Sequence, residues 1–554
     1  MTMASESNVP ITSWSNDHGS IASKYRFLFN LNSESRILLL GEHSEELHQD
    51  FVEVFDHVYL MAGRFPQEEI AQGAPYDLIF VSSFSAATLT WFTLNVSQIC
   101  RFARPDAVLL VAVPRRMGIQ NITRWRINYE LIRSSRSVRA YRKLIKDAGF
   151  KEIRENLMVP DHNNPDDFID ANVGTIELRS NINPIIALAV TTGIYRYLHR
   201  DIMFIAYRDM DNAFSLFLGQ LHKELEKIGV YCKALTIDRF CLRTRGSIIV
   251  FVTELNSSSG FVVRISPCEA VDRVTRMNCQ WLNRIHQNDK FSQVDQCLVP
   301  QNLAAFRYRD CMVYVETRSA GVIAWKYEMR PRVEGRLFEC ACRFLYSFNC
   351  AFKEKLHADR RVFDEIIGHD LRKVEQQLLS SQLNRSIVSD IRGALESLLM
   401  RRDMQLVVGH GDFGYGNILY NVRDGKISGV IDWDTAISRE LPTVDLINLI
   451  ILRVRRDLRC DTAVAIDQLF ENPELRLKLS WDRNFYDERE FGLRRHDFAV
   501  SLCVAGIRTV TRSLNFPDEF HDRIATGNNT LRSINRILQQ LVTSDMALAK
   551  ADAT

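Results

Sequence analysis

Four short apolar runs, separated by segments of helical length, constrain the first third of this chain more than any other feature. The runs are RILLLGE at 36–42, HVYLMAG at 57–63, YDLIFVSS at 76–83 and DAVLLVAVP at 106–114. Each run is almost continuously apolar, which is typical of strands that are buried on both faces. Such strands, alternating with helices, form a parallel sheet covered by helices. The pattern therefore predicts an α/β domain at the start of the chain.

The pattern changes after about residue 210. The stretch FCLRTRGSIIVFVTELNSSSGFVVRIS (240–266) predicts three strands and two turns, and CMVYVET (311–317) predicts another strand. A helix is expected between them at about 268–287, and from 335 onwards the spacing of apolar residues is mostly helical. A small antiparallel sheet followed by a helical region predicts an α+β domain with two lobes.

The length of 554 residues is too great for one hydrophobic core, so several domains are expected. The predicted limits are a disordered tail at 1–20, an α/β domain at 21–210, a connecting helix and linker at 211–240, a first lobe at 241–318 and a helical lobe at 319–545.

Composition and charge argue against several classes of partner. The formal net charge is +2, so there is no bulk electrostatic reason to expect a nucleic acid or an anionic membrane. The 12 cysteines include no Cys-x-x-Cys pair, and we expect reduced thiols in a cytoplasm. The start of the chain does not resemble a signal peptide, and the apolar run at 184–198 is too short to span a membrane.

The most informative stretch is VVGHGDFGYGNILYNV at 407–422, followed by GVIDWDTA. Asp412 and Asn417 lie in a loop that glycines punctuate, and an expected hairpin delivers Asp432 near them. Phosphoryl transfer needs one carboxylate to orient the attacking hydroxyl, and oxygen ligands to hold Mg²⁺ against the phosphates. Taken alone, an Asp and an Asn in a glycine-rich loop more often form only a turn.

The joint pattern HGDFGYGN plus VIDWD resembles the aminoglycoside phosphotransferase and choline kinase family, whose fold is protein-kinase-like. The resemblance extends over roughly 235–545. It implies that Asp412 is the catalytic base and that Asn417 and Asp432 are the Mg²⁺ ligands. It also implies that His410 braces the loop and that Asp434 supports the metal or the substrate. Asp445, in LPTVDLINL, is expected to be a brace of the helical lobe.

The same resemblance assigns a nucleotide site to the first lobe. Arg264 in FVVRIS is expected to contact the ATP phosphates, and Gly246 to let a turn approach them. The backbone of Glu316 and Thr317 is expected to meet the adenine. The family places an acid in the following helix as a partner for the basic residue, but the expected position is at or near Thr275.

The first part of the chain resembles a class I S-adenosylmethionine-dependent methyltransferase with a Rossmann-like fold. The resemblance lies in YDLIFVSS, in ICRFARPDAVLLVAVPR and in LIKDAGF. The cofactor loop of that class usually reads Gly-x-Gly, and here only Gly41 is present. The second apolar run has no acid to hold a ribose. A role in recognition or assembly is therefore favoured for this domain, and S-adenosylmethionine binding stays the alternative.

The sequence thus predicts an ATP- and Mg²⁺-dependent phosphotransferase that acts on a hydroxyl of a small molecule. Two alternatives stay open: methyl transfer by residues 21–210, and a binding protein without catalysis. The acceptor and the oligomeric state are not predicted. Acids that could attract a cationic acceptor, or lie on a solvated surface, are Asp482, Asp487 and Glu488.

Overall fold

The structure is a computed structural model. It describes residues 31–41, 45–61, 70–71, 73–82, 86–114, 137–159, 167–170, 201–208, 213–242, 247–255, 260–326, 331–378, 382–422, 424–472, 495–515 and 523–551. The predicted tail at 1–20, the run at 184–198 and the acids at 482–488 lie outside these residues.

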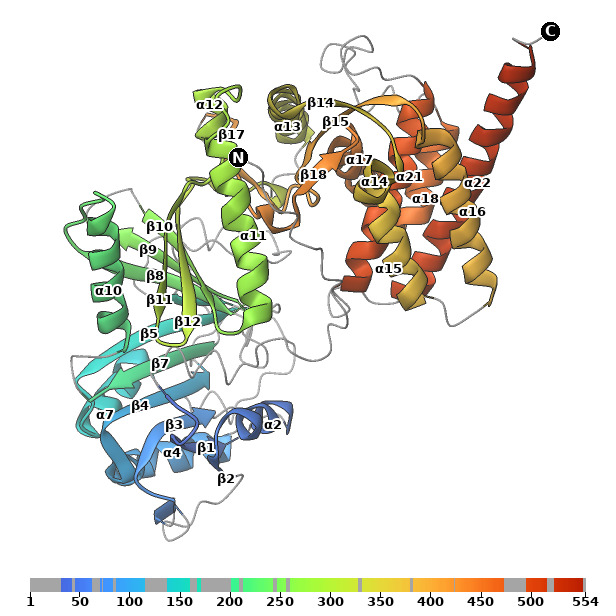
Figure 1. The fold of residues 1–554 in the computed structure, drawn as a ribbon. Coiled ribbons are helices and arrows are strands. Elements are labelled where there is room, and N and C mark those ends of the chain that lie inside the picture. Colours follow the sequence, from blue (N-terminus) through green and yellow to red (C-terminus); the bar gives the residue numbers. More distant parts are fainter. Residues whose placement is uncertain are drawn as a thin grey trace. The chain divides into compact units, whose positions relative to one another are not determined.

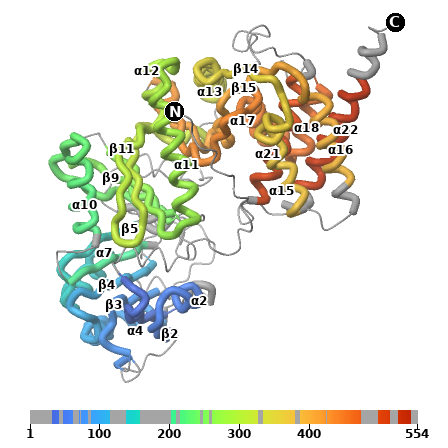
Figure 2. Tube along the Cα trace, in the orientation of Figure 1, coloured from blue at the N-terminus to red at the C-terminus, as the bar shows by residue number. Residues whose placement is uncertain are grey.

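The described residues form two compact units. The sheet unit takes its residues from Ser15–Arg276 and Asn302–Arg318, and the helix-rich unit from Met277–Gln301 and Ser319–Thr554. Helix α11 (Glu269–His286) contributes residues to both units. Figures 1 and 2 trace the chain through each unit by colour.

The sheet unit begins with parallel strands, as the apolar runs predict. Strands β2, β1, β3 and β4 lie in that order and pair in parallel. Their bounds are β1 Arg36–Gly41, β2 His57–Met61, β3 Tyr76–Ser82 and β4 Ala103–Pro114. Both faces of β1 are covered: Ile37 and Leu39 pack into one core, and Leu38 and Leu40 into another. This explains why residues 37–40 are all apolar.

Helices cover the two faces of this sheet. On one face, α2 (Glu45–Val54) contributes Phe51 to the core that contains Ile37. Helix α10 (Ala213–Lys227) adds Phe217 to the same core farther along the sheet, where it contacts the strands at 235–242 and 302–308. On the other face, α4 (Ala86–Ile99) and α7 (Val138–Asp147) contribute Phe92 and Tyr141. The first part of the unit is therefore an α/β structure (Figure 1).

The sheet continues through antiparallel strands to the predicted first lobe. The order beyond β4 is β7, β5, β6, β8, β9, β10, β12 and β11. The bounds are β5 Glu152–Val159, β6 Asp167–Asp170, β7 Asp201–Tyr207, β8 Leu235–Leu242, β9 Ile248–Glu254, β10 Gly260–Ser266, β11 Asn302–Tyr308 and β12 Cys311–Thr317. Strand β6 pairs with β8, so one sheet of 12 strands runs across the predicted linker at 211–240. The domain limits derived from the sequence stay a prediction.

The helix-rich unit combines two small sheets with a bundle of helices. The strands are β13 Val322–Ile323, β14 Glu354–His357, β15 Asp403–Gly409, β16 Ile418–Asn421, β17 Lys426–Val430 and β18 Ile437–Glu440. The helices include α12 Gln293–Gln296, α13 Pro331–Phe352, α14 Arg360–Phe363, α15 His369–Leu378, α16 Gln382–Leu399, α17 Val444–Leu458, α18 Thr462–Glu471, α21 Arg495–Asn515 and α22 Arg523–Ala551. The predicted hairpin after Asn417 is confirmed by the antiparallel pair β16 and β17.

Helix α21 lies at the centre of the bundle. It contacts α15, α17, α18 and α22, and the views in Figures 1 and 2 agree with these neighbours. Every residue from 499 to 507 is buried, and most of them are apolar or small. A helix buried on most sides makes a rigid support for the side chains at its exposed end. Among the described residues, no helix is both long enough and apolar enough to cross a membrane.

Candidate active site

The loop between β15 and β16 carries His410, Asp412 and Asn417. Gly411 takes a left-handed conformation there, with φ of +80°. A Cβ atom at this position would lie 2.2 Å from the backbone oxygen of Thr435. Only glycine fits both constraints, so the loop can lie directly against the turn after Asp432. The Thr435 hydroxyl donates back to the carbonyl of His410 at 3.2 Å.

Asp445 fixes the start of this loop. It lies in the first turn of α17, and its two carboxylate oxygens accept hydrogen bonds from the backbone N–H groups of His410 (2.6 Å) and Gly411 (3.1 Å). Burial raises the pKa of Asp445, and the nearby His410 and these N–H groups act in the opposite direction. The helix N-terminus also favours a negative charge at this position. The geometry is that of a structural brace, as the sequence predicts for Asp445.

His410 is buried and engaged on both ring nitrogens. Nε2 lies 3.0 Å from the carbonyl of Ile431, and Nδ1 accepts the N–H of Asp412 at 3.3 Å. A carbonyl can only accept, so the ring carries its proton on Nε2. Burial lowers the pKa of His410, which favours this neutral form. The ring packs against Trp433 at 4.5 Å between centroids, so His410 braces the loop.

Asp412 and Asn417 are joined directly. The amide nitrogen of Asn417 donates to the backbone carbonyl of Asp412 at 2.9 Å and to its Oδ2 at 3.2 Å. The carbonyl of Asn417 accepts the N–H of Ile431 at 2.9 Å, so the residue after Ile431, Asp432, follows directly beside Asn417. The structure therefore brings together the three residues that the sequence selected.

Asp432 has an unusual backbone for a residue with a side chain, with φ of 70° and ψ of 63°. Left-handed residues other than glycine are costly and tend to occur at functional sites. The next residue, Trp433, is fully buried, and its N–H donates to Asn278 Oδ1 at 2.9 Å. This anchor holds the turn that also contains Asp434.

The oxygen donors of Asn417 and Asp432 suit a hard cation. Mg²⁺ is usually held by one or two carboxylates together with substrate phosphates. In the part of the chain that the structure describes, no group of three or more His, Cys, Asp or Glu side chains could enclose a metal. An amide and a carboxylate side by side match the oxygen ligands that Mg²⁺ takes together with phosphates.

Sequence reasoning missed Arg512. This residue lies near the end of α21, and its guanidinium Nη1 contacts Asp412 Oδ1. Arg508, one turn earlier, pairs with Glu440 at 2.9 Å and also contacts Asp370. Arg512 and Asp412 are 100 residues apart in the sequence. Nothing in the local sequence around Arg512 distinguishes it from a solvated helix arginine.

Arg264, which the sequence predicts to contact the ATP phosphates, pairs with an acid that the sequence did not predict as its partner. Arg264 Nε lies 2.9 Å from Glu316 Oε1, and their side chains are only 13% and 3% exposed. Strands β10 and β12 pair with Arg264 opposite Tyr314, so Glu316 two residues later lies on the same face. The Glu316 side chain thus holds the arginine, a role that the sequence did not assign to it. Thr317 pairs with Phe261.

The helix acid expected as partner for Arg264 is absent at Thr275. The buried Thr275 hydroxyl lies 3.0 Å from both Ser266 Oγ and the carbonyl of Val271. The earlier acid Asp272 accepts from the Tyr314 hydroxyl at 2.6 Å. Within the described residues, the carboxylate that pairs with Arg264 therefore comes from β12. Gly246, the other predicted nucleotide residue, lies outside the described residues.

Gly41, the single glycine of the expected methyltransferase loop, has a packing reason to be glycine. Its φ is +105°, and a Cβ there would lie 1.8 Å from the backbone oxygen of Ser82. The close approach of β1 to β3 therefore explains this residue without a cofactor. The methyltransferase resemblance stays a prediction.

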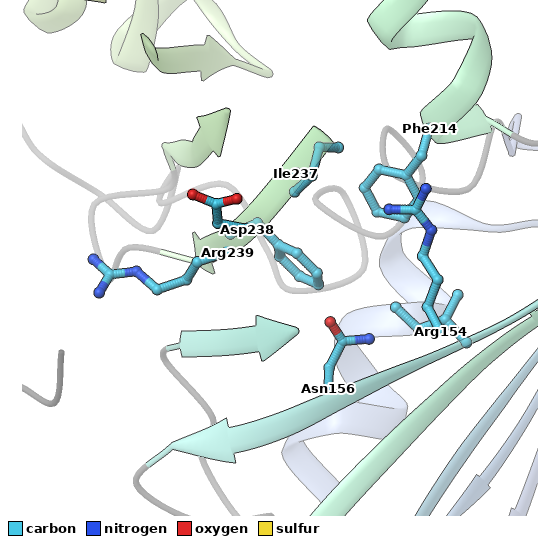
Figure 3. Close-up of a pocket in the computed structure, with 8 residues that line it drawn as sticks. Arg154, Asn156, Phe214, Ile237, Asp238 and Arg239 are labelled. Carbon is cyan, nitrogen blue, oxygen red and sulfur yellow. The ribbon is translucent and has the colours of Figure 1, made fainter. Parts of the chain in front are cut away.

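A small hollow also lies in the sheet unit, bordered by β5, β8 and α10 (Figure 3). Its empty space, including open solvent, is about 230 Å³. The labelled side chains in Figure 3 are Arg154, Asn156, Phe214, Ile237, Asp238 and Arg239, and none of them is a predicted site residue.

The decisive comparison concerns the segment that carries the loop between β15 and β16. Residues 249–478 match the model of the phosphotransferase enzyme family. The segment includes the loop of His410, Asp412 and Asn417, the Asp432 turn and Asp445, and it covers less than half of the 554 residues. The resemblance stated for the C-terminal part is thereby confirmed, and the sheet of β8–β12 followed by helices agrees with the kinase-like fold of this family. No curated protein matches the chain.

Solved structures of phosphotransferases are similar at a low level. A putative aminoglycoside phosphotransferase from Ralstonia eutropha is 10% identical, with 59% of this chain and 98% of that chain covered and a TM-score of 0.39. Ethanolamine kinase from Plasmodium vivax is 12% identical, with 61% and 92% covered and a TM-score of 0.39. An aminoglycoside phosphotransferase from Streptomyces rimosus is 13% identical, with 53% and 98% covered and a TM-score of 0.31. The family match rests on the sequence of residues 249–478 and not on these structures.

Proposed function

We propose that this protein transfers the γ-phosphoryl group of ATP to a hydroxyl of a small molecule, with Mg²⁺ as the metal ion. The single observation that carries the proposal is the junction of Asp412 and Asn417. It joins a carboxylate to an amide in a loop whose backbone is fixed by Asp445, next to Asp432. The family match of residues 249–478 supports the reaction class.

Asp412 acts as the residue that orients the acceptor. A carboxylate oxygen can accept more than one hydrogen bond, so Oδ1 can accept the acceptor hydroxyl while Arg512 stays in contact. Asn417 restrains Oδ2 and thereby fixes the rotation of the carboxylate. Positioning of this kind, with charge stabilisation, supplies most of the catalysis in phosphoryl transfer.

The remaining residues divide between metal and nucleotide. Asn417 and Asp432 would hold Mg²⁺, and Asp434 supports them. When bound, the ion neutralises charge on the phosphate oxygens. Arg264 clamps phosphate oxygens of ATP with Glu316 behind it, Gly246 contributes to the phosphate turn, and backbone groups of Glu316 and Thr317 contact the adenine.

Ligand-dependent thermal unfolding of wild type and Asp432→Asn tests the nucleotide part of this proposal. A ligand present at about 100 times its dissociation constant adds roughly 2.7 kcal/mol of stability. ATP with Mg²⁺ should stabilise the wild type, and the Mg²⁺-dependent part should disappear in the variant. A protein that gains no stability from ATP, with or without Mg²⁺, would contradict the proposal. Stabilisation by S-adenosylmethionine alone would instead favour the methyltransferase hypothesis.

A further inference from the structure

The position of Arg512 bears on the chemistry of the acceptor. Helix α21 presents two arginines one turn apart, Arg508 and Arg512, toward the same side of the helix-rich unit. Arg508 contacts the carboxylates of Glu440 and Asp370 and the carbonyl of Ile366. These contacts fix the end of α21, so that a rigid helix holds Arg512 beside the loop that carries Asp412 and Asn417.

The pair formed by Arg512 and Asp412 differs from the Arg508 cluster in its exposure. The Glu440 side chain is 2% exposed, whereas that of Asp412 is 33% exposed and that of Arg512 is 18% exposed. A small molecule can therefore reach Asp412 and Arg512 but cannot reach Glu440. The Arg508 cluster is structural, and the Arg512 pair lies where a ligand can contact it.

The two oxygens of Asp412 face different partners. Oδ2 accepts from Asn417, which is the proposed metal ligand and so lies on the phosphate side. Oδ1 contacts Arg512. Arg512 is therefore on the other side of the carboxylate, where the acceptor hydroxyl must arrive.

A cation at this position has a clear chemical consequence. A guanidinium at the position where the acceptor must arrive attracts a negatively charged group of the acceptor and repels a positively charged one. A planar guanidinium carries five N–H donors, and its fork matches the oxygens of carboxylate and phosphate groups.

We propose that Arg512 binds an anionic group of the acceptor, so that the substrate is a hydroxyl compound carrying a carboxylate or a phosphate. This inference rests on the proposed function. In the reaction, the acceptor oxygen bonds to the γ-phosphorus of ATP, and the bond from that phosphorus to the bridging oxygen breaks. ADP leaves with that electron pair, and the hydroxyl proton passes to Asp412.

The test uses four acceptors with the same three-carbon skeleton and different charge: glycerate, glycerol 3-phosphate, glycerol and 2-aminopropane-1,3-diol. Transfer of labelled γ-phosphoryl from ATP to each is measured with the full chain, together with ATP hydrolysis in water. The variants are Arg512→Gln, which removes the charge, and Arg512→Lys, which keeps it. The matched control is Arg361→Gln, because the Arg361 side chain is 80% exposed and pairs with Glu365 four residues later.

In wild type and Arg361→Gln, kcat/KM for at least one anion should exceed that for the amine by tenfold or more. Arg512→Gln should reduce that ratio to about one, chiefly through a higher KM for the anion. Arg512→Lys should keep the preference for the anion over the amine. Whether glycerate or glycerol 3-phosphate is preferred distinguishes a carboxylate from a phosphate.

Three results would overturn the inference. Preference for the amine would show a cationic acceptor, and ATP hydrolysis without transfer to either anion would show that charge at Arg512 does not select the substrate. An equal loss with every acceptor and in hydrolysis would show that Arg512 acts on the base or on the phosphoryl group. All three leave the phosphotransferase proposal intact. Failure of that proposal is recognised separately, by the absence of both ATP binding and ATP turnover in wild type.

Discussion

Replacement of Asp445 tests whether one buried carboxylate determines the geometry of the loop that carries His410, Asp412 and Asn417. Its oxygens accept backbone N–H groups at 2.6 Å and 3.1 Å. Hydrogen bonds to a charged group contribute about 1.5–3 kcal/mol each, and a buried donor without a partner costs a similar amount. Asp445→Asn keeps one acceptor oxygen and should lose about 1.5–3 kcal/mol, while Asp445→Ala loses both acceptors. Because burial already opposes the charge, we expect a loss of about 3–5 kcal/mol for alanine.

Amide hydrogen exchange measures this effect locally. A loss of about 1.5–3 kcal/mol corresponds to exchange that is roughly 10 to 150 times faster for the N–H groups of His410 and Gly411. Asp461→Asn is the matched control, because Asp461 caps α18 through Val464 at 2.9 Å and Asn caps a helix about as well as Asp. If both Asp445 variants exchange at the wild-type rate in this peptide, the bracing role is wrong.

Three further predictions concern a buried acid, an ion pair of the sheet unit and the glycine of the Asp412 loop. Burial raises the pKa of Glu440 from 4.5 to about 7, so the folded state binds the Glu440 proton more tightly than the unfolded state does. The protonated Glu440 therefore stabilises the fold fully below about pH 4.5, and this stabilisation is lost as the pH rises through about 7. Glu440→Gln should flatten that decline in urea unfolding at pH 5 to 8, and parallel curves would contradict this. Glu316→Gln should raise KM for ATP at least several-fold by releasing Arg264, and Glu316→Asp should restore part of it; equal kinetics in all three proteins would exclude the role. Gly411→Ala should lose about 2 kcal/mol or more in calorimetry, because φ is +80° and the added Cβ meets a backbone oxygen at 2.2 Å; an unchanged melting temperature would refute the strain argument.

Local features of the structure follow well from the sequence. The four apolar runs form β1 to β4. In β1, β3 and β4 the apolar stretch is buried on both faces, whereas β2 lies at the edge of the sheet and is partly exposed. The junction of Asp412 and Asn417 could likewise be expected, since the two residues are only five apart in one loop. In both cases the information lies within a short stretch of chain.

Pairings between distant segments could not be predicted. Arg264 finds its acid on β12 because the register of two strands puts Glu316 on the same face, and sequence spacing does not give register. The contact of Arg512 with Asp412 depends on how α21 packs in the bundle. The pairing of β6 with β8 joins a strand of the predicted α/β domain to one that spans the boundary between the predicted linker and the first lobe.

Transfer of labelled γ-phosphoryl from ATP by wild type and Asp412→Asn, with Mg²⁺ and the four charged and neutral acceptors, tests the central claim most directly. If Asp412 orients and deprotonates the acceptor, the variant should bind ATP as the wild type does but turn over about 10²- to 10⁴-fold more slowly. Turnover in Asp412→Asn at the wild-type rate would contradict the account.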